Sequence, residues 1–247
     1  MINIHTLIGI AHQAGQHALR SYGSTTNEYK RDDFSSHSIV TKIDRENDAF
    51  IREQLQQAYP TYNYVGEETG IARNGSDYTF YVDPIDGTMN YAHGMPEWCV
   101  SIGLAKGRVP IAGVMYFPVL GQMYHAAVES GAYKNGVKIQ VSNTPLYKGT
   151  AFMRRNKAFK NTVAGIKETG SCCAALRYIA TGVGVASMVK AYPWDICAGA
   201  VLVREAGGII TNKRGEAWEL SDDYAVISNN AEHEKWLEAA LDTEIRA

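Results

Sequence analysis

The chain has 247 residues and a formal net charge of −2; at about 150 residues per domain this length lies between one and two domains and allows a large buried core. The near-neutral charge excludes a broad basic surface, so we expect no nucleic-acid partner, and an anionic substrate would need locally bound cations. The first residues lack the basic and apolar regions of a signal peptide, and no run of about 18 apolar residues occurs, so we expect a cytoplasmic protein without a membrane partner.

The chain begins with two predicted helices. Apolar residues at three-and-four spacing predict an amphipathic helix over residues 4–22. Residues 23–38 are polar and predict an exposed segment or hairpin. Residues 39–43 predict a short strand, after which Asp44 stands at the N-cap of a helix over residues 45–59. Capping alone would explain Asp44, so from position alone its role stays open.

Two predicted strands then end in acidic residues. Residues 63–65 run into Gly66-Glu67-Glu68, and the apolar run 78–82 is followed by Asp83-Pro84-Ile85-Asp86-Gly87-Thr88. The proline restricts the backbone, and the glycine allows a sharp turn or a close approach to a ligand. The second tip would therefore hold two carboxylates and a free carbonyl on a stiff loop, the hard-oxygen ligand set that Mg²⁺ prefers. Asp-Pro and Asp-Gly are also ordinary turn signals, which is the alternative for this stretch.

The middle of the chain is rich in predicted strands. Residues 99–105, 111–117 and 122–128 predict successive antiparallel strands, and Asn135-Gly136 predicts a hairpin turn. A polar boundary at residues 142–145 indicates the join between an N-terminal α+β lobe over residues 1–142 and a C-terminal α/β lobe over residues 143–247.

The C-terminal part alternates between strands and helices. Asp195 stands at the start of a predicted helix, where a carboxylate favours the open N–H groups and can also point into a cleft beside a bound phosphate. The cysteines, which show no C-x-x-C spacing, are expected to be reduced core residues. The cysteines are Cys99, Cys172, Cys173 and Cys197. The predicted strands of this part lie at residues 150–154, 183–189, 209–211 and 225–228, and the predicted helices at residues 171–182, 196–206 and from the cap Asn230 to about 241.

Four motifs, taken together and in order, resemble the inositol monophosphatase family, which comprises Mg²⁺-dependent, lithium-sensitive phosphatases. The motifs are Gly66-Glu67-Glu68; Asp83-Pro84-Ile85-Asp86-Gly87-Thr88 with Asn90-Tyr91; Trp194-Asp195 with Ala198-Gly199; and Glu205-Ala206-Gly207-Gly208. The resemblance implies a layered α/β fold with alternating α/β/α/β/α layers. It also implies two or three Mg²⁺ ions per site, a small phosphorylated substrate and a homodimer.

The resemblance also implies roles for individual residues. The implied metal ligands are Glu67, Asp83, the carbonyl of Ile85, Asp86 and Asp195; the implied catalytic residues are Thr88, Asp44 and Glu67, which would orient a water; and the implied substrate contacts are Asp86, the amides of Gly87 and Thr88, Asp195, and Gly170-Ser171-Cys172. Two metal ions of this kind neutralise phosphate charge and stabilise the leaving alkoxide. Thr88 is not a base at its own pKa and would pass a proton to Asp44 or Glu67.

The expected function is Mg²⁺-dependent hydrolysis of a small phosphate monoester, with inositol monophosphate favoured. Two departures concern the substrate. Where the family's inositol phosphatases carry a Glu that contacts a sugar hydroxyl, this chain has Met188, or Val189 with a shifted gap, and no Lys before Val40 aligns with the one often found in the family. Other phosphates therefore stay open: a sugar phosphate, fructose bisphosphate, histidinol phosphate or a nucleotide 3′-phosphate. A non-catalytic, partner-binding protein on the same scaffold is the alternative from a different class.

Overall fold

An eight-stranded sheet forms the frame of the N-terminal part of this computed structural model, which describes residues 2–23, 28–29, 39–40, 42–154, 159, 161–190 and 192–245. Its strand order is β10-β9-β8-β7-β6-β5-β3-β4, and among these neighbours β3 and β5 pair in parallel. The strands are β3 (Asn63–Gly66), β4 (Gly70–Ala72), β5 (Tyr78–Asp86), β6 (Cys99–Lys106), β7 (Val109–Phe117), β8 (Gln122–Ala127), β9 (Gly131–Lys134) and β10 (Val137–Ile139).

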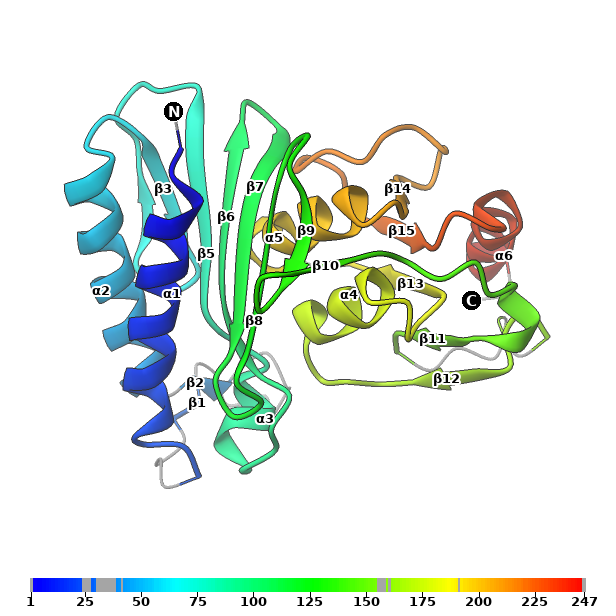
Figure 1. The fold of residues 1–247 in the computed structure, drawn as a ribbon, viewed down its shortest axis with the longest axis horizontal. Coiled ribbons are helices and arrows are strands. Elements are labelled where there is room, and N and C mark those ends of the chain that lie inside the picture. Colours follow the sequence, from blue (N-terminus) through cyan, green and yellow to red (C-terminus); the bar gives the residue numbers. More distant parts are fainter. Residues whose placement is uncertain are drawn as a thin grey trace.

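Helices cover both faces of this sheet. The helices α1 (Ile4–Leu19) and α2 (Lys42–Ala58) lie on one face, where the apolar stripe of α1 is buried against β6, β7 and β8. On the other face lie α4 (Cys172–Ala180) and α5 (Pro193–Glu205) (Figure 1). Seven of the eight residues of β6 are accordingly buried, as expected for a central strand packed on both sides.

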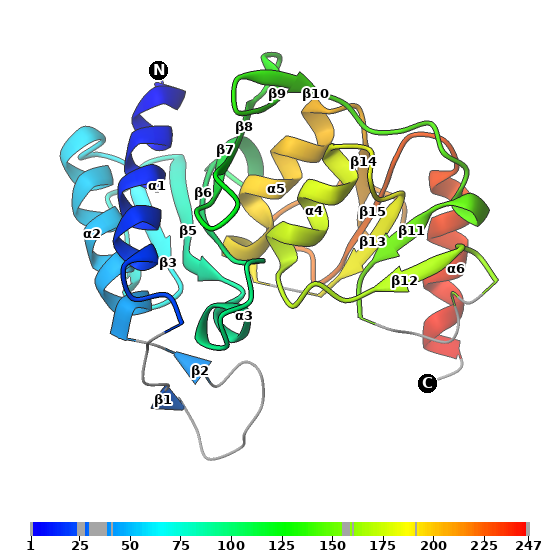
Figure 2. The ribbon, with the colours of Figure 1, turned by 60° about the horizontal axis from the view of Figure 1, so that its bottom comes forward.

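A second sheet of five strands packs on the far side of α4 and α5. Its order is β12-β11-β13-β15-β14, and α6 (His233–Ile245) covers its outer face (Figure 2). The predicted α/β/α/β/α layering is therefore confirmed. None of the described helices is long and apolar enough to cross a membrane. The strands are β11 (Thr150–Phe152), β12 (Gly165–Lys167), β13 (Ala186–Val189), β14 (Ile209–Thr211) and β15 (Ala225–Ser228), preceded by a 3₁₀ turn at Leu146–Lys148.

Most predicted elements are confirmed, including the three antiparallel strands β6 to β8 and the hairpin at Asn135-Gly136, which joins β9 and β10. Two short strands were missed, β4 and β12, because three residues that include a glycine carry too little pattern. The predicted division into lobes at residue 142 stays a prediction, although β10 ends at Ile139 and β11 begins at Thr150.

Helix starts were predicted less well. The helix α2 begins at Lys42, so Asp44 lies within its first turn and is not the N-cap. Of the strand expected over residues 39–43, the structure shows β2 (Ile39–Val40), which pairs with β1 (Glu28–Tyr29); residue 41 lies outside the described residues, and residues 42 and 43 belong to α2. Apart from β1 and Gly23, the segment expected over residues 23–38 also lies outside the described residues. The last helix begins at His233, so Asn230 does not cap it.

Candidate metal centre

The site begins where the parallel pairing of β3 with β5 ends. Gly66 of β3 pairs with Val82 of β5, so the next residues, Glu67 and Asp83, follow neighbouring strand positions. The backbone N–H of Glu67 donates to the carbonyl of Val82 at 3.1 Å. Burial is the largest cause that raises the pKa of Asp83, and the nearby charge of Glu67 is the next. The acidic tips predicted for these two strands therefore meet.

A bulge in β5 turns two of its acids toward the same place. Asp83 pairs with Ser101 and Asp86 with Cys99, so three steps along β5 oppose two along β6. Residues an odd number apart in a regular strand point to opposite faces, and one extra residue restores the same face. Pro84 fits this bulge because it has no N–H to offer the ladder. The first four residues of the motif, predicted as part of a loop, are thus the bulged end of β5.

The third acid comes from the start of α5. One carboxylate oxygen each from Asp83, Asp86 and Asp195 lie within 4.8 Å of one another. Asp195 is held in the first turn of α5, where its carboxylate accepts a hydrogen bond from the backbone N–H of Tyr192 at 2.8 Å. Asp83 and Asp86 are buried, whereas Asp195 is only half-buried and forms the more open side of the group.

The electrostatics of this group call for a cation. Burial is the largest cause that raises the pKa of Asp83 and Asp195 well above the usual range, and repulsion from neighbouring acids adds to it. Asp86 also has a raised pKa from burial, although hydrogen bonds from Ser171 and from the amides of Cys173 and Cys172 oppose the shift. A divalent ion would offset this repulsion, and an all-oxygen donor set fits Mg²⁺. The residues therefore fit the metal that the sequence predicted.

Asp86 also joins the eight-stranded sheet to α4. Its carboxylate accepts hydrogen bonds from the N–H groups of Cys172 at 3.1 Å and Cys173 at 3.0 Å, and from the hydroxyl of Ser171. Ser171 is the N-cap of α4, so the predicted substrate-contact segment starts this helix and touches a predicted metal ligand. The contact fixes the C-terminal part of the chain against the end of β5.

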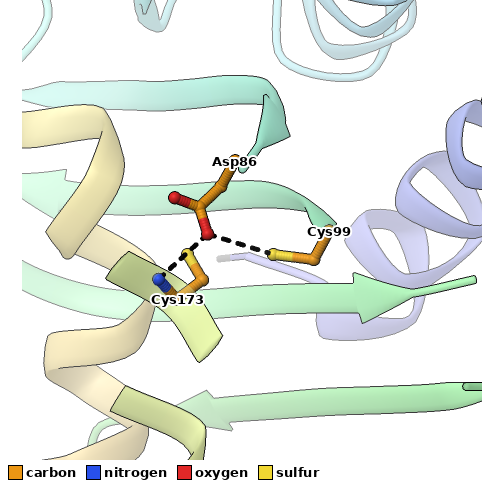
Figure 3. Close-up of side chains that lie close together, drawn as sticks. All are labelled: Asp86, Cys99 and Cys173. Atoms are coloured by element: carbon orange, nitrogen blue, oxygen red, sulfur yellow. Dashed lines mark hydrogen bonds between the residues drawn. The ribbon is translucent and has the colours of Figure 1, made fainter. Parts of the chain in front are cut away.

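Two thiols line the buried side of Asp86 (Figure 3). The Cys99 Sγ lies 4.0 Å from the Asp86 carboxylate, and burial raises the pKa of Cys99 to about 12. Burial also raises the pKa of Cys173, after its hydrogen bond with Cys99 as the first cause. These cysteines therefore carry protons beside Asp86. All four cysteines are free, as predicted, and Cys172 alone is half-buried.

Thr88 connects the β5 tip with α2. Its hydroxyl lies 3.3 Å from a carboxylate oxygen of Asp44 and 3.1 Å from the carbonyl of Ile85, and it can donate to one of them at a time. Gly87 has a φ of +91°, and a Cβ there would lie 3.0 Å from the carbonyl of Glu97, so a side chain is excluded. The structure thus brings together the residue pair that the resemblance assigned to water activation.

The segment with Gly170 is tied to the short helix α3 (Thr88–Ala92). The amide of Asn90 donates to the carbonyls of Glu97 at 2.6 Å and Thr169 at 2.8 Å. Gly170 therefore lies against Asn90, next to the turn that carries Gly87 and Thr88. Every residue predicted for the site is described and lies at this junction of β3, β5, α2, α4 and α5.

Sequence reasoning missed a buried carboxylate next to this junction. Asp48 is fully buried and contacts the turn that carries Glu67. Its spacing of four residues from Asp44 on one helix was the available signal, because such residues share a helix face. Met188, expected at a wall of the substrate pocket, is half-buried and packs against the core around α6.

Comparison with known proteins agrees with this geometry. The model of the Inositol monophosphatase family matches residues 3–246. The fructose-1,6-bisphosphatase/inositol-1-monophosphatase of Aquifex aeolicus is 32% identical over 94% of this chain and 92% of its own, and inositol monophosphatase 2 of Saccharomyces cerevisiae is 33% identical over 75% and 73%.

Solved structures show the same fold. The IMPase of Thermotoga maritima superposes with a TM-score of 0.90 at 26% identity, covering 98% of both chains. The extragenic suppressor protein suhB of Bartonella henselae superposes with a TM-score of 0.86 at 28% identity, over 96% of this chain and 97% of that one. From the match along its length and the acidic junction of β3, β5 and α5, the chain belongs to the inositol monophosphatase family.

Proposed function

We propose that this protein is a Mg²⁺-dependent phosphatase that hydrolyses small phosphate monoesters, with inositol monophosphate as the first candidate substrate. The observation that carries the proposal is the meeting of Asp83, Asp86 and Asp195 within 4.8 Å, at a place where burial and mutual repulsion disfavour their charged forms. Membership of the family and the phosphatase names of its relatives support the same chemistry.

The metal ligands would be oxygen atoms from three elements. Glu67, Asp83, the Ile85 carbonyl, Asp86 and Asp195 would hold two or three Mg²⁺ ions, with Asp83 central to the group. When bound, the ions would neutralise charge on the phosphate and stabilise the leaving oxygen. Asp86 would hold its place through the N–H groups of α4, which leave its orientation little freedom.

The attacking water would be positioned by the chain's own side chains. Thr88 would accept a hydrogen bond from the water while its hydroxyl donates to Asp44, which lies 3.3 Å away. Proton transfer along this pair would end on Asp44, because a carboxylate is a far better proton acceptor than a threonine hydroxyl. Glu67 would assist from the neighbouring strand end.

The substrate would be held beside these acids. The amides of Gly87 and Thr88 would support the phosphate, and the segment Gly170-Ser171-Cys172 would lie along the rest of the molecule. The φ of +91° at Gly87 supports this arrangement, because it forms the sharp turn that precedes Thr88. Asp86 and Asp195 would contact the substrate from the metal side.

The proposed substrates are polyol phosphates as a class, not a single compound. A name that combines fructose-1,6-bisphosphatase with inositol-1-monophosphatase belongs to one relative, and this supports activity on more than one polyol phosphate. Because Met188 packs against the core around α6, it offers no hydroxyl contact of the kind expected from Glu. Weak discrimination among polyol phosphates follows. We also propose that lithium inhibits the phosphatase activity and that the protein forms a homodimer.

A phosphate-release screen tests this function. Purified protein is incubated with inositol 1-phosphate, fructose 1,6-bisphosphate, histidinol phosphate, a nucleotide 3′-phosphate and glycerol 2-phosphate, each with Mg²⁺, with Mg²⁺ plus Li⁺, and with chelator. We expect release from the polyol phosphates, only in the presence of Mg²⁺ and reduced by Li⁺. Absence of release from every compound, in protein that is folded, would favour the non-catalytic alternative.

A further inference from the structure

We propose that Asp48 is a positioning residue that fixes Glu67 for metal binding by holding the turn between β3 and β4. This inference rests on the proposed function, because it assumes that Glu67 is a metal ligand. The role is distinct from those of the acids in the cluster, since Asp48 acts on the backbone around Glu67 and not on the metal or substrate.

The Asp48 carboxylate, on α2, accepts hydrogen bonds from the turn between β3 and β4. It is 0% exposed, and one oxygen accepts hydrogen bonds from the N–H groups of Glu68 at 2.7 Å and Thr69 at 2.8 Å. The other oxygen accepts from the Thr69 hydroxyl at 3.2 Å and from the hydroxyl of Tyr64. Hydrogen bonds from N–H groups to a charged acceptor are about twice as strong as neutral ones.

These contacts fix Glu67 from both sides. On its N-terminal side the Glu67 N–H donates to Val82 at 3.1 Å, which ties it to β5. On its C-terminal side the two N–H groups that follow Glu67 both point at Asp48. A peptide pinned at both ends leaves the Glu67 side chain little freedom beyond its own rotamers, so the carboxylate is pre-organised.

The turn is shaped around the carboxylate. A Cβ at Gly66 would lie 2.5 Å from one oxygen of Asp48 and 2.7 Å from the other, closer than any real contact. A Tyr64 ring carbon would lie 2.6 Å from the same Cβ, so Asp48 and Tyr64 together restrict the position before Glu67 to glycine. Arg52, one further turn along α2, donates to the carbonyl of Thr69 at 3.2 Å and secures the same turn.

One helix face therefore sets two parts of the site. Asp44 and Asp48 are separated by four residues of α2, or about 6 Å along its axis. Asp44 contacts Thr88, and Asp48 holds the turn with Glu67. A single helix, α2, therefore sets the positions of both Asp44 and Glu67, the two acids proposed to act on the water.

A double-mutant cycle tests the inference, with Mg²⁺ affinity measured by titration calorimetry without substrate. Asp48→Asn keeps the shape but makes the hydrogen bonds to Glu68 and Thr69 neutral. We expect it to weaken Mg²⁺ binding by about 10-fold, within the range for lost outer-shell partners. In a Glu67→Gln background, adding Asp48→Asn should change Mg²⁺ affinity by less than about 2-fold, because the ligand it positions is already lost.

A matched control separates positioning from general destabilisation. Glu205 of α5 also holds a turn, accepting from the N–H groups of Glu129 at 3.0 Å and Gly131 at 2.7 Å between β8 and β9. Glu205→Gln should lower Tm but leave Mg²⁺ affinity and kcat unchanged. Equal losses of Mg²⁺ affinity in Asp48→Asn and Glu205→Gln would overturn the inference.

The remaining outcomes are also decisive. An equal effect of Asp48→Asn with and without Glu67→Gln would overturn the positioning role while leaving the proposed function intact. A Glu67→Gln protein with wild-type Mg²⁺ affinity would overturn both the inference and the assignment of Glu67 as a ligand. If Asp48→Asn does not fold, Tyr64→Phe removes one donor to Asp48, and unchanged Mg²⁺ affinity in that variant would count against the role.

Discussion

Two groups of acids in this molecule have opposite environments: one raises the pKa values of its carboxyl groups, and the other lowers the pKa of Glu216. At the end of β5, Asp83 and Asp86 meet Asp195 in the interior, where burial and like charges raise their pKa values. In the turn after β14, Glu216 lies at the surface beside Arg214, with 2.7 Å between Glu216 Oε2 and Arg214 Nη2. Hydrogen bonds from Asn212, followed by those from Arg214, lower the pKa of Glu216.

The comparison shows how to recognise acids that need an external cation. Exposed Glu216 and half-buried Asp222 have a cation from the chain itself, since Arg214 also lies 3.7 Å from Asp222, and Asn212 donates to both acids. The buried acids are instead held by backbone N–H groups and hydroxyls, which fix their positions but carry no full positive charge. The protein keeps these acids together at a cost in stability, which is expected of a functional site.

The largest expected effect on kcat comes from replacing Asp83, the central residue of the buried acids. Asp83→Asn removes the carboxylate proposed to contact more than one ion, and loss of several kcal/mol of transition-state stabilisation corresponds to about 10³–10⁴-fold in kcat. Steady-state phosphate release with varied Mg²⁺ measures it. Glu216→Gln, the same change in the surface group, is the control and should keep wild-type kcat. A near wild-type rate for Asp83→Asn would contradict the two-metal assignment.

A smaller effect is expected from the water-positioning pair. Thr88→Ala removes the hydroxyl between the Ile85 carbonyl and Asp44, so kcat should fall by about 10²-fold, the lower end for lost acid–base assistance, because Asp44 remains. KM should change much less. The two constants are separated by full saturation curves, and a rise in KM with unchanged kcat would show that Thr88 only binds phosphate.

The pH dependence of stability sharpens the comparison further. For an acid whose pKa is higher in the folded state, the folded protein binds the extra proton between the two pKa values, so stability falls as pH rises through that window. Metal-free wild type should therefore lose Tm from about pH 4 upward more steeply than Asp83→Asn, whose repulsion is reduced. Thermal melts in chelator at several pH values measure this. Parallel curves for the two proteins would be inconsistent with a raised pKa at Asp83.

The smallest effect is expected from the surface group. Arg214→Ala removes the cation beside Glu216 and Asp222, but exposed ion pairs contribute little because water screens them. Tm should move by no more than about 2 °C, and kcat should be unchanged. Melting curves and phosphate release check both. A loss of Mg²⁺-dependent activity here would mean that the two groups of acids are coupled.

The acidic tips of two strands are the part of the site that the sequence predicted best. Glu67 and Asp83 each come after an apolar run that predicted a strand, so two acidic strand tips could be expected before the fold was seen. The parallel pairing that brings the two tips together is known only from the structure. The pairing of Thr88 with Asp44 came from family resemblance, because 44 residues separate the two and no spacing rule links them. The layers followed from the same resemblance and from the alternation of apolar runs.

The features that were missed depend on tertiary contacts. The bulge in β5 is defined by its pairing with β6, which the local sequence does not encode beyond Pro84. The role proposed for Asp48 depends on N–H groups 20 and 21 residues away, and in the sequence a buried acid on a helix cannot be told from an exposed polar residue. The start of α2 was misplaced because the β-branched residues Ile39-Val40-Thr41 favour a strand, and the expected strand was extended over Lys42 and Ile43, which belong to the helix.

The most direct test of the account is the effect of Mg²⁺ on thermal stability in wild type and Asp83→Asn, measured at pH 7 without substrate. If the buried acids form a cation site, Mg²⁺ at about 100 times its Kd should stabilise the wild type by about 2.7 kcal/mol and raise its Tm. Asp83→Asn should melt at or above the wild-type temperature in chelator and gain much less from Mg²⁺. A wild-type Tm that does not respond to Mg²⁺, or an equal response in both proteins, would contradict the account.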